Sequence, residues 1–155
     1  MSLNKTDKKY CHIAGMRIDA TTYADASDRA IGAAKERKSV FFCISNTHVV
    51  TEAYKNSRYR SIINSAEVVT PDGVPLVWCM RLFGIIAAER VCGPDLLFAI
   101  CQKAQAQNIA VGFYGSKDTT RSLMVQKIKK QFPQLRVAYS YSPSFRVLTE
   151  AEDKR

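Results

Sequence analysis

The stretch AEVVTPDGVPLVWCMRLFGIIAAERVCGPDLL, residues 66–97, holds the clearest indications of the fold. It begins with a short apolar, β-branched run, Val68-Val69-Thr70, which predicts a buried strand. Proline and glycine break the extended conformation, so Pro71-Asp72-Gly73 ends this strand and leaves Asp72 at its carboxyl end. Two polar clusters follow, Glu89-Arg90 and Gly93-Pro94-Asp95, and the second begins a helix. Ligands bind at the carboxyl ends of strands in open α/β sheets, so we place the candidate site here.

Strand-like and helical segments alternate along the rest of the chain. Apolar runs of strand length occur at 39–45, 108–114 and 135–141. Strands that are apolar throughout are typical of a parallel sheet covered by helices on both sides. The sequence therefore predicts an α/β fold, a Rossmann-like parallel sheet with helices on both faces. Helices are expected at 19–38, 49–65, 74–86, from Pro94 onward and at 118–132, and an edge strand or hairpin at 12–18.

Length and composition indicate one soluble or peripheral domain. A chain of 155 residues that is 46% hydrophobic can bury one core, so we expect a single domain over 10–155 and a disordered, Lys-rich tail over 1–9. Its five cysteines include no C-x-x-C pair, which favours a reducing cytosol over disulfides or structural zinc. No signal peptide or membrane-spanning run is recognisable. The net charge of +9 favours an anionic partner: nucleic acid, an acidic membrane surface or a phosphorylated small molecule.

Several motifs together resemble the bacterial WecG/TagA/CpsF glycosyltransferases, glycosyltransferase family twenty-six. Members make N-acetylmannosaminyl-type transfers in wall teichoic acid, common antigen and exopolysaccharide synthesis. The resemblance covers about residues 10–153 with the motifs in the family's order. The motifs are Asn46, Thr70-Pro71-Asp72-Gly73, the segment from Glu89 to Leu96, Gly112-Phe113-Tyr114-Gly115 and the segment from Ser142 to Arg146.

The resemblance implies an inverting transfer of a sugar from a UDP donor to an undecaprenyl-diphosphate-linked sugar. The expected location is the cytoplasm, peripheral at the inner face of the cytoplasmic membrane, with a homo-oligomer as a further partner and no nucleic acid. The family's proposed catalytic base falls on Asp72, and the nucleotide sugar is expected near Tyr114-Gly115. The substrate-binding residues that we predict are Asn46, Thr47, Gly73, Arg90, Gly93, Asp95, Tyr114 and Gly115.

The sequence departs from the family pattern at two places. Some members carry a threonine two residues before the asparagine, where this chain has Ile44, so that polar role passes to Ser45 or Thr47 or is absent. The family also continues with another strand, a Pro-Lys-Gln-Glu loop and, in many members, a basic C-terminal appendage that reaches the membrane. Residues 148–153 resemble a capped helix beginning close to Arg155. We therefore expect the chain to be the front two-thirds of the enzyme.

The chemistry of such a transfer matches these residue types. A sugar hydroxyl is a poor nucleophile, and a carboxylate such as Asp72 can act as its general base. The departing diphosphate needs cations or backbone donors, for which Arg90, Lys117 and the helix N-termini after Gly93 and Gly115 are candidates. No D-x-D pair is present in these loops, so we expect neither a metal requirement nor a cofactor.

Each of these assignments has a structural alternative. Asp72-Gly73 is compatible with an ordinary tight turn, and Arg90 with an ion pair to Glu89 or Asp95. Asp95 also suits the first turn of a helix, and Asn46 also suits a helix cap. His48 and Glu52 have a metal-ligand spacing, but one pair is weak evidence.

Two other functions compete with the enzyme. One is a basic Rossmann-like module that binds a polyanion or a membrane surface without catalysis. The other is a scaffold that uses the apolar segment 74–86 for self-association or membrane contact. Lys127, Lys129 and Lys130 are expected to form a solvated face, with attraction to anionic lipid as the minority interpretation.

Overall fold

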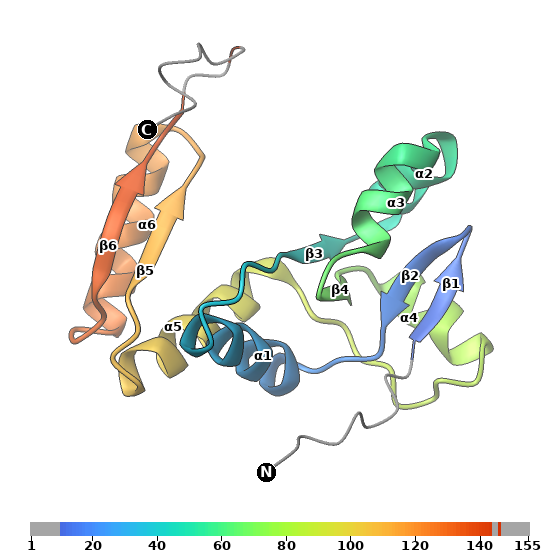
Figure 1. Cartoon of the computed structure of the whole chain (residues 1–155), viewed down its shortest axis with the longest axis horizontal. Coiled ribbons are helices and arrows are strands. Elements are labelled where there is room, and N and C mark those ends of the chain that lie inside the picture. Colours follow the sequence, from blue (N-terminus) through green and yellow to red (C-terminus); the bar gives the residue numbers. More distant parts are fainter. Residues whose placement is uncertain (1–9, 144–145, 147–155) are drawn as a thin grey trace. The chain divides into compact units, whose positions relative to one another are not determined.

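The computed structural model describes residues 10–143 and residue 146, which form a mixed α/β fold (Figure 1). They divide into two compact units, one ending at Ile100 and one beginning at Cys101. The first unit contains β1 (Tyr10–Ile13), β2 (Met16–Asp19), α1 (Tyr23–Lys35), β3 (Phe42–Ser45), α2 (Thr47–Lys55), α3 (Ser57–Asn64), β4 (Val68–Pro71) and α4 (Val74–Leu82). Helix α5 (Gly93–Ala106) runs across the division, and the second unit continues with β5 (Val111–Tyr114), α6 (Asp118–Gln131) and β6 (Val137–Tyr141). The helical beginning expected at 148–153 lies outside the described residues.

Parallel pairing of strands confirms the predicted α/β class. In the first unit β3 runs parallel to β4, with Phe42 opposite Val68 and Ser45 opposite Pro71. In the second unit β5 runs parallel to β6. Strands β1 and β2 form the hairpin that was one of two alternatives for this segment.

The described strands form three two-stranded sheets, whereas the sequence suggested one wider sheet. A physical reason is visible at one of the two breaks, between β2 and β4. The backbone N–H of Val69 donates to the Asp19 carboxylate over 2.7 Å, so a side chain takes the donor that a neighbouring strand would otherwise use. Arg17 supports this arrangement by pairing with Asp19 over 3.1 Å. Side chains therefore replace a backbone ladder at this edge of β4.

The core of the first unit lies between the hairpin, β4 and α4. Its fully buried members include Met16, Ile18, Val69, Leu76 and Met80. A second cluster joins α1 to the beginning of α5 through Ala26, Val91 and Leu96. These two clusters hold the segment on either side of Asp72 against the body of the unit.

Helices α1 and α4 end earlier than their apolar patterns suggested, and a residue with positive φ follows each of them and also α5. Arg37 (φ 53°), Gly84 (φ 88°) and Asn108 (φ 52°) lie just beyond α1, α4 and α5. After α4, the Gly84 N–H donates to the Arg81 carbonyl and the Ile85 N–H to the Met80 carbonyl, which is the Schellman pattern. Helix α4 consequently ends at Leu82 and not at residue 86.

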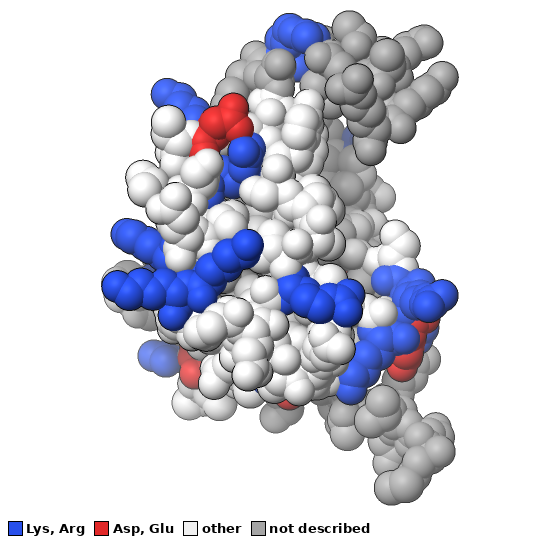
Figure 2. Space-filling model, turned by 90° about the vertical axis from the view of Figure 1, so that its left-hand side faces the viewer, with Lys and Arg blue, Asp and Glu red and all other residues white. Residues whose placement is uncertain are grey.

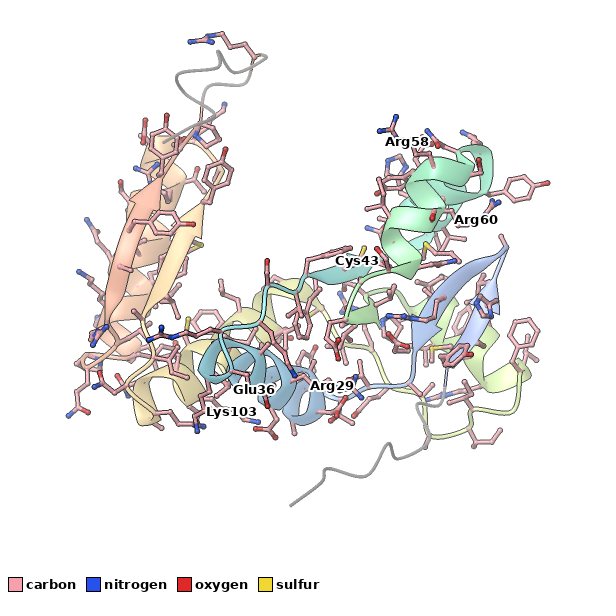
Figure 3. All side chains as sticks on the ribbon, in the orientation of Figure 1. Arg29, Glu36, Cys43, Arg58, Arg60 and Lys103 are labelled. Carbon is pink, nitrogen blue, oxygen red and sulfur yellow. The ribbon has the colours of Figure 1, made fainter. Side chains whose placement is uncertain are left out.

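The single helix expected at 49–65 is two helices, α2 and α3. Asn56 has extended backbone angles and separates them, and its side chain accepts the N–H of Tyr59 at the beginning of α3. Arg60 on α3, labelled in Figure 3, donates to the carbonyls of Ala53 and Tyr54 on α2. A capping side chain overrides the continuous helical pattern here.

The second unit carries a basic face. Figure 2 shows Lys and Arg side chains with few Asp and Glu over the face that it draws. The side chains of Lys127, Lys129 and Lys130 on α6 are all exposed, as expected for a solvated face.

Candidate functional site

The carboxyl ends of β3 and β4 lie side by side and place Asn46 next to Asp72-Gly73. The Asp72 N–H donates to the Ser45 carbonyl over 2.7 Å. A Cβ added to Gly73 would lie 3.9 Å from the Asn46 Cα, so the two chains run in contact there. Asp72 thus lies between a parallel strand and a helix, and not at the tip of a hairpin.

Arg90 forms an ion pair with Asp72. Its Nη2 lies 3.0 Å from Asp72 Oδ1, and this hydrogen bond raises the pKa of the Arg90 guanidinium above its ordinary value. The Asp72 side chain remains 21% exposed and that of Arg90 52% exposed, so both groups are accessible from solvent. The structure thereby selects Asp72, and neither Glu89 nor Asp95, as the partner of Arg90.

The loop that carries Arg90 is fixed to β4 by its neighbour. The N–H of Val91 donates to the Pro71 carbonyl over 3.0 Å, and the Val91 side chain is fully buried. Pro71, the neighbour of Asp72, is therefore bonded through its backbone to Val91, the neighbour of Arg90. This explains why two side chains 18 residues apart meet.

Three helix N-termini begin at this strand end. Asn46 caps α2 by accepting the N–H groups of His48 and Val49, α4 begins directly after Gly73, and α5 begins at Gly93. A Cβ added to Gly93 would lie 3.7 Å from the Ile44 side chain, which places the beginning of α5 against β3. Helix N-termini carry partial positive charge, so this edge favours anions. Asn46 therefore serves as a helix cap, which is one of the roles that the sequence allowed for it.

A hydrogen-bonded cluster behind the Arg90 loop was not anticipated from the sequence. The Cys92 thiol donates to Asp95 Oδ2 over 2.9 Å, and the Cys92 N–H donates to the Tyr23 hydroxyl over 3.0 Å. The Tyr23 oxygen also lies 3.4 Å from Asp95 Oδ2. Burial, reinforced by the hydrogen bond to Cys92, raises the pKa of Tyr23 above its ordinary value. Asp95 thus makes internal contacts through one of its oxygens, and its role as a substrate ligand stays a prediction.

Some family members carry a threonine where this chain has Ile44, and Thr47 is the accessible candidate to replace it. The Ser45 side chain is fully buried, 3.3 Å from the Cys43 sulfur, and therefore does not face solvent. Thr47 is exposed at the first position of α2. Thr70, which is not among the predicted substrate-binding residues, is buried with a hydroxyl that bonds to no described residue.

Tyr114 and Gly115 belong to the second unit, where they end β5. Gly115 has φ 109°, a conformation that favours glycine, and its N–H donates to the Tyr141 carbonyl over 2.9 Å. The exposed ring of Tyr114 lies 6.0 Å from that of Tyr141. Lys117 is exposed just before α6. These residues form a strand-end turn of their own, and their proposed contact with a nucleotide sugar stays a prediction.

Metal-ligating side chains do not cluster in the part of the chain that the structure describes. No group of three or more His, Cys, Asp and Glu residues within it is placed to hold a metal ion. His48 and Glu52 accordingly remain an isolated pair. Among the described helices, none is long and apolar enough to cross a membrane.

Comparison with known proteins identifies the family. The profile described as "Glycosyl transferase WecG/TagA/CpsF family" matches residues 11–155. The chain belongs to the WecG/TagA/CpsF glycosyltransferase family. The match covers nearly the whole chain and includes the Asp72 and Arg90 motifs, in agreement with the resemblance found in the sequence.

Two curated relatives of this WecG/TagA/CpsF chain carry the same name, N-acetylglucosaminyldiphosphoundecaprenol N-acetyl-beta-D-mannosaminyltransferase. The protein of Bacillus spizizenii (strain ATCC 23059 / NRRL B-14472 / W23) is 29% identical over 125 residues, which are 81% of this chain and 44% of the relative. The protein of Bacillus subtilis (strain 168) is 25% identical over 100 residues, or 64% of this chain and 39% of the relative. The chain therefore spans less than half the length of either relative.

Proposed function

We propose that this chain carries the catalytic base of an inverting glycosyltransferase. The enzyme would move an N-acetylmannosamine-type sugar from a UDP donor to an undecaprenyl-diphosphate-linked sugar in cell-surface polysaccharide or teichoic acid synthesis. The observation that carries the proposal is the Asp72 carboxylate at the end of β4, held by Arg90 and still accessible. The names of the two Bacillus relatives support the acceptor and the transferred sugar.

The proposed reaction uses Asp72 as a general base. Its carboxylate accepts the proton of the acceptor hydroxyl while the hydroxyl oxygen attacks the anomeric carbon of the donor sugar. The bond between that carbon and the UDP oxygen breaks on the opposite face, and UDP departs with the electron pair. General-base assistance of this kind contributes roughly 10²- to 10⁴-fold in rate, or about 3 to 5 kcal/mol.

Arg90 and the helix N-termini supply the positive charge that the leaving group needs. Arg90 uses one nitrogen for Asp72, and its side chain is about half exposed, so other donors of the same guanidinium face solvent. The beginnings of α2, α4 and α5 add the positive ends of their helix dipoles at the same edge. This positive environment supports our proposal that the transfer requires neither a metal ion nor a cofactor.

The remaining parts of the proposal concern partners and location. The donor is a UDP-sugar, the acceptor is a polyprenyl-diphosphate-linked sugar, and the enzyme works as a peripheral protein at the inner face of the cytoplasmic membrane. We also propose that the enzyme forms a homo-oligomer and does not bind nucleic acid. The net charge of +9 supports a location at an anionic membrane surface.

The decisive experiment replaces Asp72 by Asn in the full-length protein. Turnover should fall at least about a hundredfold, because an amide cannot accept the proton, while donor binding stays nearly intact. A transfer assay with UDP-N-acetylmannosamine and a lipid-linked N-acetylglucosamine acceptor measures the first quantity, and calorimetric titration of the donor measures the second. Glu36→Gln, at the exposed end of α1, is the matched control and should leave both unchanged. Wild-type turnover in Asp72→Asn would remove Asp72 from the role of base.

The second candidate function is a basic module that holds a polyanion without catalysis. It is favoured by the exposed lysines of α6 and the basic face in Figure 2. It predicts retention on nucleic acid with a steep dependence on salt concentration. Retention of this kind, together with a complete lack of transferase activity in the full-length protein, would favour the module over the enzyme.

A further inference from the structure

Helix α4 is apolar on two opposite sides. One side packs Leu76, Val77 and Met80 into the core. The other presents Val74, Trp78 and Leu82, which are spaced four residues apart and therefore lie in one row along the helix. Trp78 is 60% exposed and Leu82 is 87% exposed, so this row faces solvent within the described residues.

Two further large apolar side chains are exposed just beyond the helix end. The positive φ of Gly84 turns the chain there, and Phe83 and Ile86 remain largely exposed on either side of that glycine. We define the α4 apolar surface as Val74, Trp78, Leu82, Phe83 and Ile86. Soluble proteins rarely expose so many large apolar side chains together unless the surface binds a partner.

The charge within this segment of the chain favours an anionic partner. Arg81 is the single charged residue between Gly73 and Glu89. Its guanidinium donates to the Ala88 carbonyl over 3.0 and 3.3 Å, which holds the cation at the edge of the surface and ties the following loop to the helix. The α4 apolar surface is thus bordered by an arginine, and no carboxylate occurs in the same segment of chain.

We propose that the α4 apolar surface docks onto an anionic lipid bilayer. Trp78 would lie at the level of the lipid head groups, Leu82, Phe83 and Ile86 would enter the acyl region, and Arg81 would face the phosphates. Tryptophan and arginine suit these positions, because an amphipathic ring prefers the interface and a guanidinium binds phosphate in a bidentate manner. The contact is separate from the basic C-terminal appendage that the family resemblance implies.

A second copy of the chain fits this surface less well. In a two-fold contact centred on the row, each copy would bring its own Arg81 to the border. No carboxylate between Gly73 and Glu89 is available to pair with it. A bilayer with anionic lipids supplies that missing charge, and the net charge of +9 adds long-range attraction.

The purpose of this contact rests on the proposed function. Helix α4 begins two residues after Asp72, so its nine residues hold Val74, Trp78 and Leu82 within about 14 Å of its beginning along the helix axis. An acceptor that is anchored in a membrane would then meet the base close to the lipid. The binding itself is testable without any enzymatic readout.

Trp78 is the only tryptophan of the chain and reports on the surface directly. The full chain is mixed with phosphatidylcholine vesicles that contain or lack phosphatidylglycerol, and tryptophan emission is recorded. We expect a blue shift and quenching by bromine-labelled acyl chains, both stronger with phosphatidylglycerol and weakened by salt. Unchanged emission with both vesicles would overturn the proposal.

Variants then assign the binding to the surface. Leu82→Asp should lower the vesicle partition coefficient at least about tenfold, because a carboxylate would have to enter the acyl region. Leu123→Asp is the matched control, since Leu123 is 60% exposed on α6, and it should bind like the wild type. Leu82→Asn serves as a second variant, and circular dichroism verifies the fold of each. Equal partitioning of Leu82→Asp and the wild type would contradict the proposal.

Two other outcomes would assign a different occupant. A blue shift without vesicles that grows with protein concentration and disappears in Leu82→Asp would identify a second copy. Blue emission at every concentration without vesicles would identify a covering segment of the same polypeptide. Either result overturns the lipid contact, and transferase activity lost in Asp72→Asn would still support the proposed function independently.

Discussion

At the scale of single residues, the candidate site depends on short contacts between side chains that are distant in sequence. Asp72 and Arg90 are 18 residues apart, and Tyr23 and Cys92 are 69 apart. The first pair was within reach of sequence reasoning, because both residues belong to motifs at a strand end. Tyr23 was not, because nothing in its own neighbourhood indicates that it will accept the N–H of Cys92.

Tyr23→Phe should weaken the segment that holds Arg90. The change removes the hydroxyl that accepts the Cys92 N–H and leaves a partly buried donor unpaired, which costs about 1 to 3 kcal/mol of unfolding free energy. Urea unfolding of the full-length protein measures this loss. Tyr54→Phe is the control, because that side chain is 69% exposed, and it should stay within about 0.5 kcal/mol of the wild type. Equal stability of both variants would show that the Tyr23 hydroxyl contributes nothing.

At the scale of elements, the chain's hydrophobic pattern located the helices and strands but missed where several end. Gly84 is a recognisable helix stop, since glycine is common just after a helix. Arg37 takes the same left-handed conformation without that signal, and Asn108 takes it with the weaker signal of an asparagine. Asn56 divides a continuous helical pattern with its side chain, and Asp19 occupies the edge of β4. The Asn56 cap is a local contact that spans three residues and the Asp19 contact is a tertiary one that spans 50, and hydrophobic periodicity contains neither.

Asp19→Ala should be among the most destabilising single changes in the first unit. It leaves the Val69 N–H without its acceptor and the Arg17 cation, with 18% of its side chain exposed, without its carboxylate. Breaking a buried ion pair in this way costs about 3 to 5 kcal/mol. Thermal and urea unfolding measure the change, with Glu36→Gln as the surface control, because that glutamate pairs with Lys38 where both are largely exposed. A loss below that of the control would mean that β2 is held to β4 by packing alone.

At the scale of the whole molecule, the sequence predicted the order of the elements, their parallel pairing and the family. The division at Ile100 was not expected, because helix α5 runs through it without interruption in its apolar pattern. The residues that the family resemblance assigns to the base and to the nucleotide sugar fall in different units. Binding of the nucleotide sugar should therefore be measured on the full-length protein, which contains both units.

Excess UDP should raise the melting temperature of the full-length protein. A ligand that binds only the native state stabilises it by about 2.7 kcal/mol at a hundred times its dissociation constant. Differential scanning fluorimetry with UDP and UDP-N-acetylmannosamine measures the shift, and ADP at equal concentration controls for a general phosphate effect. An equal response to ADP would argue for unspecific anion binding, and no response to any nucleotide would count against a UDP donor.

The backbone bonds on either side of Asp72 have an energetic consequence for the proposed transfer. The Asp72 N–H is bonded to Ser45, and the neighbouring Pro71 carbonyl is bonded to Val91. The carboxylate and the guanidinium are consequently aligned by folding itself, before any sugar arrives. Electrostatic preorganisation of this kind lowers the reorganisation energy that charge movement would otherwise require in water.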